Sequence, residues 1–150
     1  MDRQRMFFRL ACVFGCLGVV IGAFGAHGLK SHLIDTYGAT RAAELLAIFD
    51  TGVKYHFLHA IALLAVSSAG ERLNLWPESG GRAMCVAAWS WLVGIVLFSG
   101  SLYILAATNT PWLGAVTPFG GLAFIVGWVA LFFAVGRRSA APADAAGGRP

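Results

Sequence analysis

The chain has 150 residues, a length typical of one domain, and a formal net charge of +4. Hydrophobic residues make up 58% of it and charged residues only 12%, against roughly 45–50% and about 25% in soluble domains. The apolar residues gather in four long stretches, which argues against a soluble domain and predicts a polytopic membrane protein. The basic residues form no run with interleaved aromatic side chains, so we expect no nucleic-acid partner. The three cysteines are odd in number and have no paired spacing, which predicts no disulfide framework.

The first apolar stretch, residues 6–26, is long enough to cross a hydrocarbon layer of about 30 Å. We expect it to be the first transmembrane helix. Its small-residue end, Ala23-Phe24-Gly25, also resembles a signal-peptide cleavage site, so a cleaved leader stays open as an alternative.

Residues 27–52 have a mixed composition. Turn-prone residues from Ser31 to Gly38 predict a turn. Beyond them, apolar side chains follow the three-and-four spacing of an amphipathic helix: Ala42, Leu45, Leu46, Phe49 and Val53. We expect a helix that lies on the membrane surface, and its continuity with the next span stays open.

The second apolar stretch, residues 53–69, is short for a membrane span and contains Lys54, His56 and His59. A polar connection, residues 70–83, leads to the third stretch, residues 84–107. The fourth, residues 115–135, contains Thr117-Pro118, a helix cap followed by proline at the first helical position.

These elements predict an all-α fold, an integral membrane bundle of four transmembrane helices with an amphipathic segment before helix two. The transmembrane domain is expected to cover residues 1–136. Residues 137–150 have no apolar period and predict a disordered cytoplasmic tail.

The basic residues predict the orientation of such a bundle. With four spans, three basic residues fall on one side, namely Lys30, Arg41 and Lys54. Eight fall on the other side: Arg3, Arg5, Arg9, Arg72, Arg82, Arg137, Arg138 and Arg149. The positive-inside rule then places both termini in the cytoplasm of a bacterium, with the protein in its inner (plasma) membrane.

Small residues recur on single faces of the first and fourth spans. Such stripes let helix backbones approach closely, which is a main source of helix association in a bilayer. We expect them to pack helices of one chain together, and a homo-oligomer interface is the alternative. The glycines concerned are Gly15, Gly18, Gly22, Gly25, Gly120 and Gly127.

Polar side chains of the spans are expected to gather at the periplasmic end of the bundle, where they could contact a ligand or lipid headgroup. The residues are His27, Lys30, Lys54, His56, His59, Ser99, Ser101, Tyr103 and Thr117. Interfacial side chains that satisfy one another are the simpler reading. The three histidines as metal ligands, or a haem held by His27 and a helix-two histidine, are further alternatives.

Catalysis and transport have weaker support in the sequence. A nucleophilic Ser99 or Ser101 beside His59 would need an orienting acid, and Asp50 is the one nearby candidate. The spans contain no Asp or Glu that could relay protons.

Four motifs, in this order, resemble a known family: GAFGAHGLK (22–30), KYHFLHAIALLAV (54–66), LFSGSLYILA (97–106) and LGAVTPFGGLAFIVGW (113–128). Together they are similar to the YgdD-like small inner-membrane proteins, domain of unknown function 423, which has mitochondrial relatives. The resemblance covers about residues 6–135 and implies a multi-pass inner-membrane protein with no assigned reaction. Its motif positions are Gly22, Gly25, His27, His59, Ser99, Gly100, Ser101, Thr117, Pro118 and Gly120.

From the sequence we expect a non-enzymatic module that contacts lipids or a partner through its periplasmic end. A small oligomeric transporter or channel is the alternative, and a membrane enzyme or a metal or haem protein comes third. We expect no cofactor, and as partners membrane lipids together with a second copy or another membrane protein.

Overall fold

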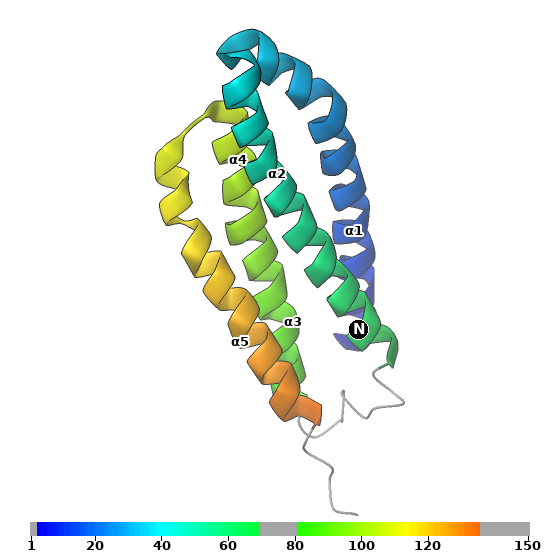
Figure 1. The fold of residues 1–150 in the computed structure, drawn as a ribbon. Coiled ribbons are helices and arrows are strands. Elements are labelled where there is room, and N and C mark those ends of the chain that lie inside the picture. Colours follow the sequence, from blue (N-terminus) through cyan, green and yellow to red (C-terminus); the bar gives the residue numbers. More distant parts are fainter. Residues whose placement is uncertain (1–2, 70–80, 136–150) are drawn as a thin grey trace, which may run out of the picture.

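The computed structural model describes residues 3–69 and 81–135, and within these ranges every long element is helical, which confirms the all-α prediction. Figure 1 shows the helices running along a common axis. The predicted tail, residues 137–150, and most of the 70–83 connection lie outside the described residues. The elements are α1 (Arg3–Phe24), η1 (Gly25–Leu29), α2 (Lys30–Ala69), α3 (Arg82–Gly94), η2 (Ile95–Ser99), α4 (Gly100–Thr108), η3 (Pro111–Ala115) and α5 (Thr117–Val135).

Among the described residues, three helical segments are long and apolar enough to cross a membrane: Arg3–Ala69, Arg82–Thr108 and Pro111–Ala134. The predicted count of four is therefore not supported as it stands. The first segment has 67 residues, or about 100 Å at 1.5 Å per residue, far more than one crossing needs. Figure 1 shows why, because this segment folds back so that α1 and α2 lie side by side.

The reversal is made at Gly38, the last residue of the turn predicted over Ser31–Gly38. These residues are helical, and only Gly38 leaves the helical region, with φ 78° and ψ 163°. Because this combination is essentially restricted to glycine, one residue is enough to redirect the chain. The predicted surface helix is part of α2 and continues without a break to Ala69.

The buried positions of α2 explain that continuity. They follow three-and-four spacing from the amphipathic segment into the apolar stretch, with the series Ala42, Leu45, Phe49, Gly52, His56, His59, Leu63 and Ser67. A single stripe of this period belongs to a single packed helix. The continuity that the sequence left open is therefore present, and the helix that contains the predicted span 53–69 begins before Val53.

The helices form a chain of neighbours in which α1 packs along α2, α2 along α4, and α5 along α3. One buried cluster, around Phe7, Trp91 and Phe124, joins α1, α2, α3 and α5. A second, around Leu33, Leu45 and Leu105, fills the end of the bundle that contains η1. In Figure 1 the start of α1, the end of α2, the start of α3 and the end of α5 lie together at the opposite end.

Glycines occupy the closest helix contacts. An added Cβ at Gly18 would meet the Phe57 ring at 3.0 Å, and one at Gly22 would meet Val53 at 3.6 Å. A Cβ at Gly25 would overlap the ring of Phe49. All three partners lie on α2, so the first stripe faces a helix of the same chain.

The glycines of the small-residue stripe on α5 are equally close to their neighbours. A Cβ at Gly120 would overlap the backbone of Phe98, and one at Gly127 would overlap the Trp91 ring. Gly15 is different, because nothing lies within 4 Å of the added Cβ.

Candidate functional site

The two histidines of α2 are both buried but point to different helices. The Nε2 of His56 lies 2.8 Å from the carbonyl oxygen of Phe14 on α1, and its Nδ1 lies 3.1 Å from the hydroxyl of Tyr103 on α4. A carbonyl can only accept a hydrogen bond, so Nε2 carries the proton, and Nδ1 of the neutral ring accepts from Tyr103. His56 therefore connects three helices.

His59 connects α2 to α5 with the opposite arrangement. Its Nδ1 lies 2.8 Å from the carbonyl oxygen of Tyr55, and the indole N–H of Trp128 donates to its Nε2 at 3.1 Å. Indole nitrogen is only a donor, so Nε2 must be unprotonated and the ring neutral with its proton on Nδ1. Phe124 stacks on the same imidazole, with ring centroids 3.5 Å apart and planes 8° from parallel.

Hydroxyl groups fix the start of α5. Ser101 donates to the carbonyl of Phe98 at 2.9 Å, and its oxygen lies 2.9 Å from the hydroxyl of Thr117. The Thr117 hydroxyl also faces the carbonyl of Leu113 at 3.5 Å, so either hydroxyl can donate the bond between the two side chains. Ser99 is fully buried within η2.

The charged residues lie on the outside of the η1 end. His27 and Lys30 are exposed. Lys54 pairs with Asp50 at 3.1 Å, and these side chains are 69% and 65% exposed.

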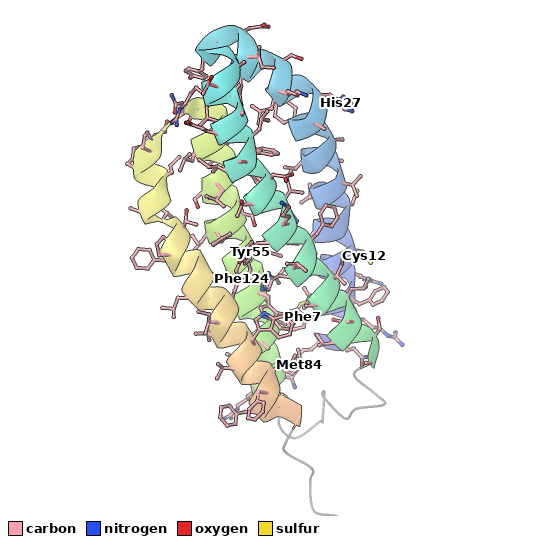
Figure 2. All side chains as sticks on the ribbon, viewed as in Figure 1. Phe7, Cys12, His27, Tyr55, Met84 and Phe124 are labelled. Atoms are coloured by element: carbon pink, nitrogen blue, oxygen red, sulfur yellow. The ribbon has the colours of Figure 1, made fainter. Side chains whose placement is uncertain are left out.

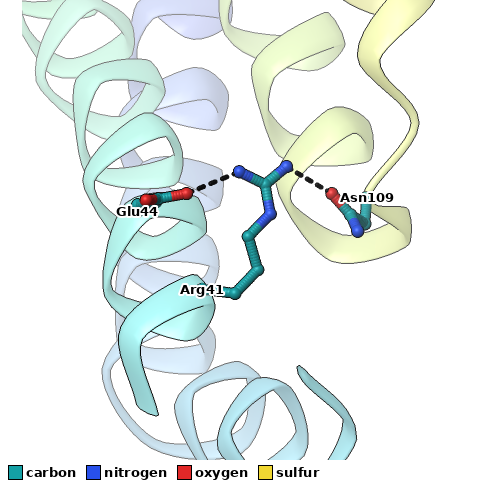
Figure 3. A network of polar contacts seen from close by, with 3 residues as sticks. All are labelled: Arg41, Glu44 and Asn109. Carbon is teal, nitrogen blue, oxygen red and sulfur yellow. Dashed lines mark hydrogen bonds and ion pairs between the residues drawn. The ribbon is translucent and has the colours of Figure 1, made fainter. Parts of the chain in front are cut away.

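A second polar contact at this end joins α2 to a turn. Arg41 pairs with Glu44 and donates to the side-chain oxygen of Asn109, both at 2.6 Å (Figure 3). It ties α2 to the turn that follows α4.

The structure does not bring the nine predicted site residues into one cluster. Figure 2 shows His27 at the η1 end, whereas Tyr55, the neighbour of His56, lies near the middle of the bundle beside Phe124. His56 bonds to Phe14, and His27 follows Phe14 by 13 residues, or about 20 Å along the helix. The sequence placed these histidines at the helix end because the second span was expected to start at Val53, whereas α2 begins before it.

The metal, haem and catalytic alternatives each need several of these residues to lie close together, and the structure does not place them so. Both ring nitrogens of His56 and of His59 are already engaged, and Asp50 pairs with Lys54 rather than orienting a histidine. Within residues 3–69 and 81–135, no group of three His, Cys, Asp or Glu side chains could hold a metal ion.

A long apolar groove of about 910 Å³ separates α2 from α5. It is lined from Tyr55 to Ala65 on one helix and from Pro118 to Trp128 on the other, about 15 Å along each. Its volume lies within the range of about 300–1,000 Å³ typical of small-molecule sites. The remaining lining residues are Leu58, His59, Ile61, Ala62, Phe98, Gly121, Leu122, Phe124 and Ile125.

The side-chain polar atoms that line this groove belong to His59, Trp128 and Tyr55, and of these the Tyr55 hydroxyl has capacity left for a ligand. Both nitrogens of His59 are bonded, and the indole N–H of Trp128 is used by His59. An occupant that needs several hydrogen bonds would leave them unmade, whereas a hydrocarbon chain needs none. The groove therefore suits an apolar molecule.

The sequence analysis missed Trp128 and the groove. One signal was available, because Trp128 carries the one indole N–H in the apolar run Pro118–Val135, and such a group usually needs an acceptor. The acceptor had to be an unprotonated nitrogen or an oxygen on another helix. No pattern in the sequence gives the separation of α2 from α5.

Comparisons with known proteins match most of the chain. The family described as "Protein of unknown function (DUF423)" matches residues 21–121. The protein "UPF0382 membrane protein YwdK" of Bacillus subtilis is 42% identical over 87% of this chain and 96% of its own length. A "UPF0382 membrane protein" of Haemophilus influenzae is 38% identical over 87% and 93%, and that of Staphylococcus haemolyticus is 37% identical over 85% and 93%. No solved structure matches the chain.

The matched family is the one that the four motifs predicted, which confirms the resemblance at that level. The narrower YgdD-like name is not carried by these relatives. Their names describe bacterial membrane proteins and specify no reaction.

Proposed function

This chain belongs to the DUF423 family, and from that premise we propose that it is a non-enzymatic protein of the bacterial inner membrane that binds the acyl chain of a lipid in the groove between α2 and α5. The observation that carries the proposal is the groove itself, apolar, about 910 Å³ in volume and lined from two helices.

Splitting the first segment at its reversal supports the proposal of four membrane crossings. Arg3–Ala69 is 67 residues long, which is enough for two crossings with a connecting end. The start of α1, the end of α2, the start of α3 and the end of α5 lie at the same end of the bundle in Figure 1, which is compatible with an even number of crossings. With most basic residues at those ends, the positive-inside rule supports cytoplasmic termini.

The exposed surface supports immersion in lipid. Large apolar side chains are more than 40% exposed on α1, α3 and α5, among them Val19, Val93 and Phe132. A soluble monomer rarely carries so much contiguous apolar surface. The groove opens into the same surroundings, where the molecules available to fill it are lipid chains.

A substitution that fills the groove tests the proposal. Ala62 lines the groove, and we expect purified Ala62→Phe to retain at least fivefold less phospholipid per chain than the wild type in native mass spectrometry. Ala23→Phe is the matched control, because Ala23 is exposed on α1 and lines neither described cavity. Equal retention by the two folded variants would contradict lipid binding in the groove.

The alternative of an oligomeric transporter built through glycine stripes gains no support from the packing. Gly18, Gly22 and Gly25 face α2, and Gly120 and Gly127 face Phe98 and Trp91. A face that is already filled by the same chain is not available to a second copy.

A further inference from the structure

We propose, on the basis of the lipid-binding function above, that the lipid in the groove is a phosphatidylethanolamine whose phosphate binds Lys54 and whose ammonium group binds Asp50. The inference names the headgroup, which the apolar groove alone does not specify.

One line of residues on α2 joins these charges to the groove. Asp50, Lys54, Leu58, Ile61 and Ala65 follow one another at spacings of four, four, three and four, so they lie on a single helix face. The last three line the groove. The charged pair therefore lies at one end of the groove, with Lys54 about 6 Å from Leu58 along the axis.

The groove is long enough to hold an acyl chain. Its lining residues on α2 alone, Tyr55 to Ala65, extend over about 15 Å. A lipid with its headgroup at Asp50 and Lys54 would place its chain along the groove, toward the end of α2 at Ala69. With cytoplasmic termini, the headgroup lies on the periplasmic side.

The charged pair is available to a headgroup. Both side chains are about two-thirds exposed, and an exposed ion pair contributes little to stability, so exchanging it for contacts with a ligand costs little. Asp50 and Lys30 also line a neighbouring cavity of about 420 Å³, which leaves space beside the pair.

Asp50 is the residue that would distinguish one headgroup from another. Lys30 and Lys54 attract the phosphate of any phospholipid. A phosphoethanolamine headgroup also presents an ammonium with three N–H donors to the carboxylate, so that opposite charges alternate. Phosphatidylglycerol carries no cation in its headgroup. Its phosphate could bind the lysines, but the Asp50 carboxylate would then lie near a second negative charge with no ammonium group between them. The quaternary ammonium of phosphatidylcholine has no N–H to donate.

The test is a competition between headgroups on identical acyl chains. Full-length protein is exchanged into micelles with equal amounts of dioleoyl phosphatidylethanolamine and dioleoyl phosphatidylglycerol, and native mass spectrometry counts the retained lipids. We expect at least threefold preference for phosphatidylethanolamine over phosphatidylglycerol. When phosphatidylcholine replaces phosphatidylethanolamine in the mixture, its preference over phosphatidylglycerol should be weaker. Asp50→Asn should reduce the ratio to about one, whereas Lys54→Gln should lower retention of both lipids.

Glu44→Gln is the matched control, because Glu44 is also an exposed acid of α2 in an ion pair, here with Arg41, and should keep the wild-type ratio. Retained lipid with no preference in the wild type, or an unchanged ratio in Asp50→Asn, would overturn the headgroup assignment while leaving the groove as a lipid site. No retained lipid in the wild type would contradict the proposed function itself.

Discussion

At the scale of single residues, the two histidines show how neighbours determine the state of identical side chains. His56 meets a carbonyl through Nε2, and His59 meets an indole N–H through the same atom. The first contact requires a proton on Nε2 and the second forbids one. Two imidazoles three residues apart are therefore held in opposite tautomers.

We expect nitrogen-15 NMR of the histidine rings to show this difference directly, with the proton on Nδ1 in His59 and on Nε2 in His56. Trp128→Phe should free the Nε2 of His59 and lower the free energy of unfolding by about 0.6 kcal/mol, and by no more than about 2, as for other hydrogen bonds between membrane helices.

Tyr103→Phe is the reciprocal control, because it removes the partner of His56 and should leave the His59 signals unchanged. A protonated Nε2 on His59 in the wild type would contradict the assigned hydrogen bonds.

At the scale of the helices, close contact depends on a few glycines. The Cβ added at Gly120 would overlap backbone atoms of Phe98, which cannot rotate away as a side chain can. The Cβ added at Gly15 would meet nothing. The glycines in the two stripes therefore differ in what they contribute.

Gly120→Ala should lower the free energy of unfolding by roughly 1–3 kcal/mol, because α5 must move away from η2. Gly15→Ala should cause no loss of stability, since alanine also favours the helix by about 0.5–1 kcal/mol. Thermal unfolding in detergent compares them, and equal stability of the two variants would show that α5 does not approach Phe98 so closely.

The reversal between α1 and α2 makes a separate prediction. At φ 78° and ψ 163°, Gly38 occupies a region that costs other residues about 1–3 kcal/mol. Gly38→Ala should destabilise the protein by that amount, measured in the same unfolding experiment. Gly100→Ala is the control, because Gly100 is helical and has open space for a Cβ; similar losses in both variants would argue against this turn.

The sequence was sufficient for the helical class and for the start of α5 at Thr117, because apolar length and a Thr-Pro pair are local signals. The sequence also contained the signal from which the continuity of α2 could have been predicted. Extending the spacing of Ala42, Leu45 and Phe49 by threes and fours reaches His56 and His59, which places them on the packed face. The contacts of those rings could not be predicted, since they depend on the rotation of three other helices.

At the scale of the whole molecule, α2 is the helix that the others share. It packs along α1 and α4, and its hydrogen bond to Trp128 bridges the groove to α5. In this arrangement, α1 and α5 lie at opposite margins with broad apolar surfaces. The number of crossings and the orientation decide which leaflet the groove faces.

Cysteine labelling of intact cells tests both properties in a chain whose three native cysteines are replaced by alanine. Four crossings with cytoplasmic termini predict that an impermeant maleimide labels His32→Cys from outside, and reaches Arg3→Cys and Arg82→Cys only after permeabilisation. Labelling of positions 3 and 82 from opposite sides would contradict four crossings, and the reverse pattern would invert the orientation.

The π-helical turn Ile95–Ser99 determines which face of α4 meets its neighbours. A π-turn takes up one residue more than an α-turn, so deleting one residue there and restoring regular winding would leave the helix beyond it on the same face. Regular winding with all residues kept would instead rotate α4 by about 100°, so that Tyr103 would leave His56 and Ser101 would leave Thr117. When DUF423 sequences are aligned across this turn, a gap of one position should therefore be interpreted as a loss of the π-turn and not as a shortened loop.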